Sequence, residues 1–352
     1  MNPEEKRVLF PAEALVEVTR GALVEATHHG FIAVVDASGK LIAKAGDLEK
    51  RTYFRSAAKP FQCIPIISSG ASEHFKLTQR ELAVITGSHS GEAIHLETVL
   101  AILEKIGLTE SSLKCGAHAP FDEAALKLMR AEGRQPQALH NNCSGKHAGM
   151  LAFARFLNEP VDDYIEPSHP IQRHIRDVLA HFAAVPADEI AIAVDGCSAP
   201  VFAMSIGAMA RSYSRLVGWK YSEIEPALAA AAERVVNAMI EYPEMVGGTH
   251  GRLDTDLMRA ARGQIVSKVG AEGVQLLGVR PCESYPKGLG IAIKIEDGDI
   301  RRARDPVVIE TLRQLGLLDH EQLAQLSKYA RAKVYNHRQI EVGEVRTCFK
   351  LW

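Results

Sequence analysis

Runs of β-branched and aliphatic residues, each followed by a polar turn, occur near both ends of the chain. Residues 31–35 read Phe-Ile-Ala-Val-Val, a turn-forming Asp-Ala-Ser-Gly segment follows at 36–39, and an apolar run returns at 41–43. The apolar run at 290–295 is likewise followed by a polar turn at 296–299. Such runs bounded by turn residues predict strands. We expect a hairpin over 30–44 and one antiparallel sheet that takes strands from both ends.

The chain between these strands shows helical spacing of its apolar residues. Positions 96, 99, 100 and 103, for example, are Leu, Val, Leu and Leu. A three- and four-residue step predicts amphipathic helices, which we place at 92–106, 122–132, 171–183 and 225–241. The predicted fold class is α/β of the α+β type: an antiparallel sheet covered by helices, with a further helical lobe. No linker rich in serine or glycine interrupts it, so residues 1–352 are predicted to form one domain with two lobes.

Composition excludes several classes of partner. The 352 residues are 47% hydrophobic, enough for a substantial core, and the formal net charge is −2. Without a long block of like charges, a nucleic-acid partner is not expected. The charged N-terminus leads into only a brief apolar stretch, so we expect no secretory segment, no membrane partner and a cytoplasmic location. Six widely spaced cysteines in such a chain are expected to be reduced or metal-bound: Cys63, Cys115, Cys143, Cys197, Cys282 and Cys348.

The most informative motif places a serine three residues before a lysine. Ser56 and Lys59 lie in the run Arg-Ser-Ala-Ala-Lys-Pro. At this spacing in a helical turn the hydroxyl and the amine share a face and can exchange a proton. A serine hydroxyl is a weak nucleophile at neutral pH, and a desolvated lysine supplies the missing base. The motif favours amide or ester hydrolysis, although it also occurs by chance on solvated helix surfaces.

Two later segments strengthen this interpretation. Ser88 lies in a Gly-Ser-His-Ser-Gly-Glu segment and Lys268 in a Ser-Lys-Val-Gly segment, each after an apolar run. Penicillin-recognising enzymes have Ser-x-x-Lys, a serine-containing loop and a Lys-Thr-Gly strand in that order. Val269 stands here where those enzymes have threonine. Pro60 and Pro65 predict that the helix carrying the first motif begins near Ser56 or is distorted.

Two further thiols lie in glycine-containing turns. Cys143 precedes a helical run and Cys197 follows a strand-like run, and thiolates are ligands that zinc prefers. Lys146 and His147 lie three and four residues after Cys143, and Asp195 could orient a ligand as a hydrogen-bond acceptor. The alternative is that both cysteines are small buried hydrophobic residues, which is the more frequent situation when no Cys-x-x-Cys pair is present.

The remaining polar loops carry weaker signals. His89 and His250 fall in predicted loops, where a histidine is usually solvated. The glycine-rich segment at 247–251 lacks the lysine of a phosphate-binding loop, and we expect it either to approach the active site or to form a simple tight turn.

Taken together, these segments resemble the Rhizobium etli type of L-asparaginase, the asparaginase II family. The resemblance spans nearly the whole chain, through segments at 55–62, 87–92, 141–150, 195–200, 254–259 and 267–273. The loop at 247–252 is one residue longer than is typical of that family. Membership would imply a fold related to serine β-lactamases and glutaminases, a homodimer, and hydrolysis of L-asparagine to L-aspartate and ammonia.

The resemblance also implies roles for individual residues. Two serine and lysine pairs match the catalytic pairs, Ser56 with Lys59 and Ser88 with Lys268. The implied zinc ligands, completed by water, are Cys143, Lys146 and Cys197, with Asp195 beside them and His147 as a near neighbour. Substrate contacts are expected from Arg55, His147 and Asp195.

We therefore expect Ser56 to attack the side-chain amide, with Lys59 as base, and water to open the resulting acyl-enzyme. Ser88 and Lys268 would relay protons or hold the substrate. Arg55 is a candidate clamp for the α-carboxylate, or else serves to depress the pKa of Lys59. The alternatives are a glutaminase or broader amidase, and a zinc-dependent protein that binds an amino acid without turnover.

Overall fold

An antiparallel sheet carries strands from both ends of the chain. The structure is a computed structural model, and it describes residues 11–330 and 332–352. Within these residues the strand order of the main sheet is β10-β11-β1-β2-β9-β8-β7, and β3 also pairs with β2. The bounds are β1 Glu13–Arg20, β2 Leu23–Asp36, β3 Leu41–Ala45, β7 Ile265–Val269, β8 Val274–Val279, β9 Leu289–Ile295, β10 Ala332–Tyr335 and β11 Glu341–Thr347.

The long strand β2 joins the two ends of the sequence. It pairs with β9 in antiparallel register, so that Ala33 lies opposite Ala292, and its last residues also pair with β3. A smaller sheet has the order β4-β6-β5, with bounds β4 Arg51–Tyr53, β5 Ala191–Val194 and β6 Pro200–Ser205. The predicted hairpin and the predicted sharing of one sheet by both ends are confirmed.

The two faces of the main sheet pack against different helices. Because side chains alternate along a strand, Phe31 and Ala33 join one core and Ile32 and Val34 the other. On the first face lies α8 (Ile206–Val217), which contacts β2, β8 and β9. On the second lie three helices, namely α11 Leu253–Ala260, α12 Asp305–Gln314 and α13 His320–Gln325.

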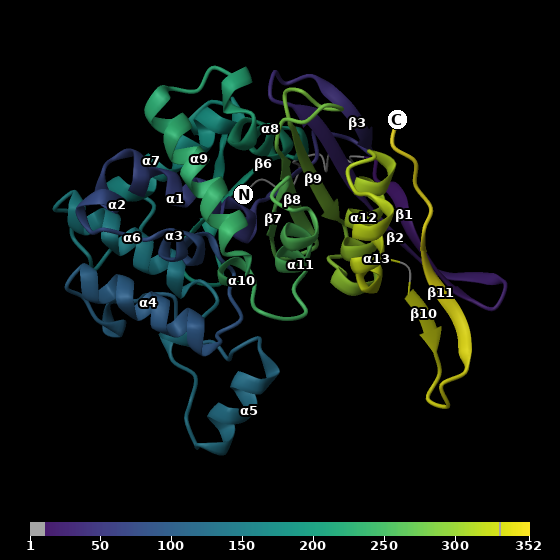
Figure 1. The fold of residues 1–352 in the computed structure, drawn as a ribbon, viewed down its shortest axis with the longest axis horizontal. Coiled ribbons are helices and arrows are strands. Elements are labelled where there is room, and N and C mark those ends of the chain that lie inside the picture. Colours follow the sequence, from purple (N-terminus) through teal and green to yellow (C-terminus); the bar gives the residue numbers. More distant parts are fainter. Residues whose placement is uncertain (1–10, 331) are drawn as a thin grey trace, which may run out of the picture.

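Further helices form a lobe beside the sheet, on the left in Figure 1, with α1 packed against α6, α7 and α9. The remaining helices are α1 Lys59–Ser68, α2 Ala71–His74, α3 Gln79–Thr86, α4 Ala93–Lys105, α5 Glu123–Ala131, α6 Ser144–Phe156, α7 Pro170–Ala183, α9 Pro226–Glu241 and α10 Pro243–Val246. Four of them, α4, α5, α7 and α9, confirm the helices predicted from periodicity. None of the described helices has both the length and the apolar character needed to cross a membrane.

The helix α1 begins as its prolines require. Residues Arg55–Ala58 form a 3₁₀ turn, and the α-helix starts at Lys59, so that Pro60 lies in the first turn, where its missing N–H is tolerated. Pro65 lies inside the helix. All six cysteines are free thiols, in agreement with the expectation that no disulfide framework is present.

Close packing of β9 against α8 generates a stability prediction. A Cβ atom added at Gly290 would overlap the carbonyl oxygen of Ala210 and the amide of Ser214, both backbone atoms of α8. Gly290→Ala should therefore lower the free energy of unfolding by about 3 kcal/mol, the upper end for overpacking. Gly207→Ala, where the nearest atoms are at 3.6 Å, is the matched control and should cause no loss. Urea unfolding of both variants tests this, and equal stabilities would contradict it.

Candidate active site

A cavity of about 440 Å³ lies between the helical lobe and the sheet, where several separate segments of the chain meet. This volume is within the range of small-molecule sites. The lining includes both predicted serines, Ser56 and Ser88, together with residues from the glycine-rich loop and from the start of α12. In full it consists of Ser56, Ser88, Phe121, Asn142, Gly251, Arg252, Leu253, Asp254, Val269, Gly270, Ala271, Ile300, Arg301, Arg304, Asp305 and Tyr329.

Ser88 lies between two lysine amines. Its Oγ is 3.1 Å from Nζ of Lys59 and 2.9 Å from Nζ of Lys268, although the lysines are 209 residues apart. Lys59 also donates to the carbonyl oxygens of Gly87, at 2.5 Å, and Asn142, at 3.2 Å. The structure thus brings both predicted serine and lysine pairs to one place, and links them through Ser88.

Local structure explains how these three side chains meet. Lys59 is the first residue of α1, and Lys268 lies in β7. Ser88 follows α3 in an extended segment whose amide donates to the carbonyl of Val246 at 2.8 Å. That segment lies against the glycine-rich loop, where Gly248 has a φ of 152° and leaves no room for a Cβ beside Ser90 Oγ. The predicted approach of this loop to the site is confirmed, since Gly251 lines the cavity.

Burial changes the proton affinity of both lysines. Lys59 and Lys268 expose 1% and 0% of their surface. Loss of hydration disfavours an ammonium ion, and burial lowers the pKa of Lys59 even though the neighbouring Cys143 thiol opposes the shift. Burial lowers the pKa of Lys268 to about 7, against the opposing charge of Asp254. Both amines are thus more often neutral, and so free to accept a proton, than the amine of an exposed lysine, and the pKa of Lys268 falls near neutral pH.

Asp254, which lies in the first turn of α11, anchors the second lysine. Its carboxylate accepts hydrogen bonds from Ser267 Oγ (2.7 Å), Gln275 Nε2 (2.8 Å) and the amide of Val269 (2.9 Å). It lies 3.9 Å from Nζ of Lys268. Burial alone would raise the pKa of Asp254, but the Lys268 charge and these hydrogen bonds lower it. Asp254 therefore stays ionised and holds β7 and its lysine in place.

Ser56 differs from Ser88 in its surroundings. It is half-buried, it lines the same cavity, and no hydrogen bond joins its hydroxyl to another described residue. The expected bond from Ser56 to Lys59 is not formed, because the lysine donates to Ser88 and to two carbonyl oxygens instead. Ser56 is thus an unengaged hydroxyl facing the cavity, and Ser88 is a hydroxyl already within a proton-exchange network.

Arg55 and Asp195, two predicted substrate contacts, bind each other. Arg55 Nε donates to Asp195 Oδ1 at 3.0 Å, and neither residue lines the cavity. Arg55 also has a φ of 51°, in the left-handed region that residues with a Cβ rarely adopt. Such backbone strain often marks functional sites, and here it immediately precedes Ser56. Whether Arg55 and Asp195 contact substrate stays a prediction.

The predicted zinc ligands are close together. Lys146 Nζ donates to Cys197 Sγ at 2.8 Å, and the thiols of Cys197 and Cys143 are close enough to shift each other's pKa. The pKa of Cys143 lies well below its usual range because of its interaction with the Cys197 thiol and because Lys59 and Lys146 are nearby. Burial alone would lower the pKa of Lys146, but the two thiols outweigh burial and raise it. The three residues form a cluster with a shared thiolate.

This thiol cluster has the donor chemistry of a soft metal site. Two sulfur atoms and one amine converge at contact distance, and a tetrahedral zinc ion takes such soft ligands. The described residues contain no group of three His, Cys, Asp or Glu side chains suited to a metal, so Lys146 is needed as the third donor. Since a ligand amine must be neutral, metal binding at this cluster requires loss of the Lys146 proton.

His89 and His147 are buried, and burial lowers the pKa of both, so that both are neutral. His147 Nδ1 lies 2.6 Å from Tyr164 OH, which already accepts from the amide of Lys114, so the tyrosine donates to His147. Buried His147 Nε2 has no partner among the described residues, and the ring does not line the cavity. The expectation that His89 is solvated is wrong. It is fully buried, with Nε2 2.9 Å from Ser144 Oγ, whereas His250 is exposed as expected.

Several cavity residues carry no recognisable sequence signal. Arg252 donates to the carbonyl oxygen of Ser88 and to Ser90 Oγ, each at 2.9 Å, and its place beside the glycine-rich loop offered the only hint. Arg304 and Asp305 lie in a basic stretch that reads as an ordinary solvated helix end. Their place in the cavity that Ser56 lines depends on sheet topology, because α12 packs on the same main sheet that contains β7.

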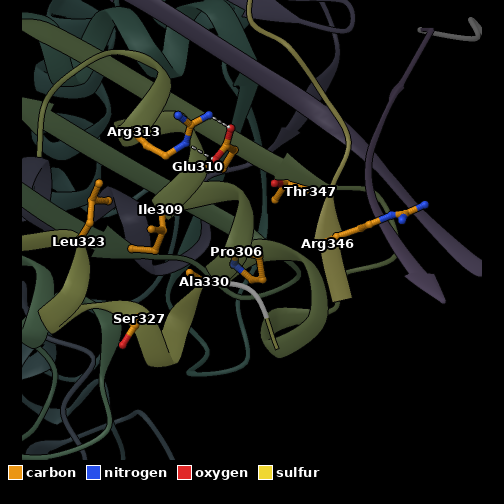
Figure 2. Close-up of a pocket in the computed structure, with 9 residues that line it drawn as sticks. All are labelled: Pro306, Ile309, Glu310, Arg313, Leu323, Ser327, Ala330, Arg346 and Thr347. Carbon is orange, nitrogen blue, oxygen red and sulfur yellow. Dashed lines mark hydrogen bonds and ion pairs between the residues drawn. The ribbon is translucent and has the colours of Figure 1, made fainter. Parts of the chain in front are cut away.

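A second hollow, of about 430 Å³, lies between α12, α13 and β11 (Figure 2). Arg313 donates to both oxygens of Glu310 on its wall, each at 2.7 Å, as the dashed lines in Figure 2 show. Its lining includes Ser327 but no lysine, so it lacks a base next to a hydroxyl. Of these two cavities, only the first has a serine hydroxyl beside lysine amines.

The sequence was compared with known protein families. The sequence model of the L-asparaginase II family matches residues 16–347, nearly the full length of the chain. The chain belongs to the L-asparaginase II family. The resemblance proposed from its motifs is thereby confirmed. A search of curated proteins found no match.

Among solved structures, the similarities are distant. "Mglu in its native form" gives a TM-score of 0.45 at 15% identity, over 84% of this chain and 66% of that one. A probable glutaminase from Bacillus subtilis, complexed with 6-diazo-5-oxo-L-norleucine, gives a TM-score of 0.38 at 13% identity, over 82% and 84% of the two chains. The chain thus spans slightly under two thirds of the length of the first of these proteins.

The pKa of Lys268 generates a pH prediction. Because the proton relay through Ser88 needs Lys268 as a neutral amine, kcat/KM should rise with pH through about 7, where Lys268 loses its proton. The charges around this amine are Asp254, which raises its pKa, and Lys59 and Arg252, which lower it. Asp254→Asn removes the stabilising carboxylate, so the inflection should move to lower pH.

Amide hydrolysis measured from pH 5 to 9 tests this expectation. Asp162→Asn, which changes an exposed aspartate elsewhere, is the control and should leave the inflection in place. An inflection that stays fixed in Asp254→Asn, or that moves to higher pH, would contradict the assignment to Lys268.

Proposed function

We propose that the protein is an L-asparaginase, which hydrolyses the side-chain amide of L-asparagine to L-aspartate and ammonia. The observation that carries this proposal is the position of Ser88 between two buried lysine amines, beside a cavity that a second, unengaged serine also lines. One hydroxyl is thereby available for attack and the other for proton transfer. Family membership supports the same class of reaction.

In the first half of the reaction, Ser56 Oγ attacks the amide carbonyl carbon and its proton passes to the neutral amine of Lys59. The carbonyl π electrons move to oxygen, where backbone N–H groups near Ser56 would stabilise the charge. As the carbon–oxygen double bond re-forms, the C–N bond breaks. Ser88 gives its proton to the departing nitrogen, and ammonia leaves.

Ser88 regains a proton from the ammonium of Lys59, which it already contacts at 3.1 Å, and the amine returns to its neutral state. In the second half, water attacks the acyl-enzyme ester. Its proton returns through the same amines to Ser56, and L-aspartate is released. Lys268, at 2.9 Å from Ser88, holds the relay hydroxyl in position and limits positive charge through its own low pKa.

We further propose that Cys143, Lys146 and Cys197 hold a zinc ion, as their convergence supports. Bound zinc would act as a Lewis acid toward an oxygen ligand and would take over the role of the Lys146 proton. Lys59 would then contact both the thiol cluster, through Cys143, and the relay serine. The homodimer and the cytoplasmic location remain predictions.

Substrate choice is the first test of the proposed function. One added methylene in a site of fixed length typically changes kcat/KM by about 10- to 200-fold. Ammonia release by the purified protein should therefore favour L-asparagine over L-glutamine by at least about 10-fold. A Ser56→Ala, Lys59→Met double variant measures contaminating activity. Equal specificity constants for the two amides would instead indicate a broader amidase.

Nucleophile identity is the second test. Ser56→Ala should lower kcat by at least about 10³-fold, and Ser88→Ala should also be severely impaired, because members of one relay are not additive. Ser69→Ala, an exposed serine just after α1, is the control and should be fully active. An electrophilic asparagine analogue followed by peptide mass spectrometry should label Ser56. A label on Ser88 with Ser56 unmodified would reverse the two roles.

Metal content is the third test. Elemental analysis should find up to one zinc per chain, and Cys143→Ala with Cys197→Ala should lose it, because two of three ligands are removed. The control replaces two cysteines outside the cluster, Cys282 and Cys348, with alanine and should retain the metal. Zinc retained by the first double variant would place the metal elsewhere.

A further inference from the structure

A buried ion pair on the cavity wall has no role in the chemistry described so far. Arg304 and Asp305 expose only 6% and 7% of their surface, yet both line the cavity that contains Ser56. Burying an ion pair costs desolvation free energy of several kcal/mol per ion before any gain. A pair placed in a substrate-sized cavity, rather than in solvent, therefore suggests that its charges are used there.

The geometry of the pair leaves one carboxylate oxygen of Asp305 and one guanidinium nitrogen of Arg304 available to a ligand. Arg304 donates from Nε at 2.9 Å and from Nη2 at 2.6 Å, and both bonds fall on the same oxygen, Asp305 Oδ1. The hydrogen bonds of the described residues give no partner to Asp305 Oδ2 or to Arg304 Nη1. Neither atom is among the enclosed polar atoms that lack a partner, so both remain accessible. One acceptor and one donor are thus presented side by side.

The backbone holds the pair rigidly. Arg304 ends a π-helical turn over Ile300–Arg304 that runs directly into α12, and such turns frequently occur at functional sites. Asp299 caps the turn by accepting from the amide of Arg302 at 2.9 Å. Ala303 and Val307, on either side of the pair, are fully buried in the second core. The pair cannot swing away without disturbing that core.

The other charges around the cavity favour a ligand with both signs of charge. Arg252 and Arg301 also line it, so cations outnumber the one carboxylate, Asp305, that is not committed to a lysine. Asp254, the other acid of the wall, is occupied by three donors and by Lys268. An α-amino acid carries an ammonium and a carboxylate on one carbon, and this matches one free acceptor beside several cations.

We propose that Asp305 and Arg304 bind the α-ammonium and α-carboxylate groups of the amino-acid substrate and so set the reach of its side-chain amide toward Ser56. The inference rests on the proposed amidohydrolase function. It assigns the head group, meaning the α-ammonium and α-carboxylate, to the start of α12 and not to Arg55 and Asp195. The charged groups of Arg55 and Asp195 bind each other, and neither residue lines the cavity. A fixed head-group position would also explain selection of one side-chain length.

Substrates that lack one head group test each residue separately. Asp305→Asn should lower kcat/KM for L-asparagine by at least about 10-fold while changing that for succinamate, which has no α-ammonium, by less than about 3-fold. Arg304→Gln should behave in the same way toward L-asparagine but spare 3-aminopropanamide, which has no α-carboxylate. Equal losses on all three amides would show a purely structural role and overturn the inference.

Two matched variants complete the kinetic experiment. Arg313→Gln removes the same charge from the far end of α12, in the hollow of Figure 2, and should leave all three substrates unaffected. Arg55→Gln tests the competing clamp. A selective loss on L-asparagine and succinamate in Arg55→Gln, with Arg304→Gln unchanged, would assign the carboxylate to Arg55 instead.

A measurement on the unmodified protein guards against variants that fail to fold. A crystal structure with L-aspartate should place its ammonium within hydrogen-bond distance of Asp305 Oδ2 and its α-carboxylate on Arg304. L-Aspartate bound to Arg55 and Asp195 would overturn the inference even if asparagine is hydrolysed. If the unmodified protein releases no ammonia from asparagine, the proposed function fails. The crystal structure with L-aspartate then decides by itself where the α-ammonium and α-carboxylate groups bind.

Discussion

Burial of three lysine amines, two of them hydrogen-bonded to Ser88, is the constraint on which the active site depends. Lys59, Lys146 and Lys268 each expose 2% of their surface or less. Three ammonium ions could not be kept together out of water, because each costs several kcal/mol to desolvate and repels the others. The protein resolves this by lowering the pKa of two of the amines and by placing a thiolate beside the third. The same solution favours the neutral form of both Lys59 and Lys268, and brings the pKa of Lys268 to about 7.

The counter-charges are held by elements that have little freedom to move. Asp254 is bound by residues of β7 and β8, so the carboxylate that stabilises Lys268 is fixed to the sheet. The Ser88 segment is joined to the end of α10 by the bond to Val246 and to the glycine-rich loop by the bond from Ser90 Oγ to the carbonyl of Gly247. Arg252 ties the same segment to the start of α11. Preorganised donors and acceptors of this kind need no reorganisation during reaction. The rigidity of the surrounding fold is therefore part of the site.

The thiol cluster and the serine relay are connected through a single side chain. Lys59 contacts Ser88 and also the thiol of Cys143, so the charge state of the cluster acts directly on the lysine amine. A thiolate at Cys143 favours the ammonium form of Lys59, whereas a positive charge at Lys146 opposes it. The protonation state of this cluster, and any metal it holds, thus influences the proton affinity of the candidate base.

The sequence by itself determined the elements and most of the chemistry. Periodicity predicted α4, α5, α7 and α9, because one-sided burial leaves a local pattern. Motif spacing indicated Ser56 and Lys59, and the family resemblance indicated Ser88 and Lys268. Only the tertiary structure showed that Lys59 bonds Ser88 and not Ser56, and that Arg304 and Asp305 reach the cavity. The first contact joins α1 to the Ser88 segment, and the second places the start of α12 on the cavity that Ser56 also lines. Pairings across such distances follow from packing of the sheet and its helices, and local sequence carries no trace of them.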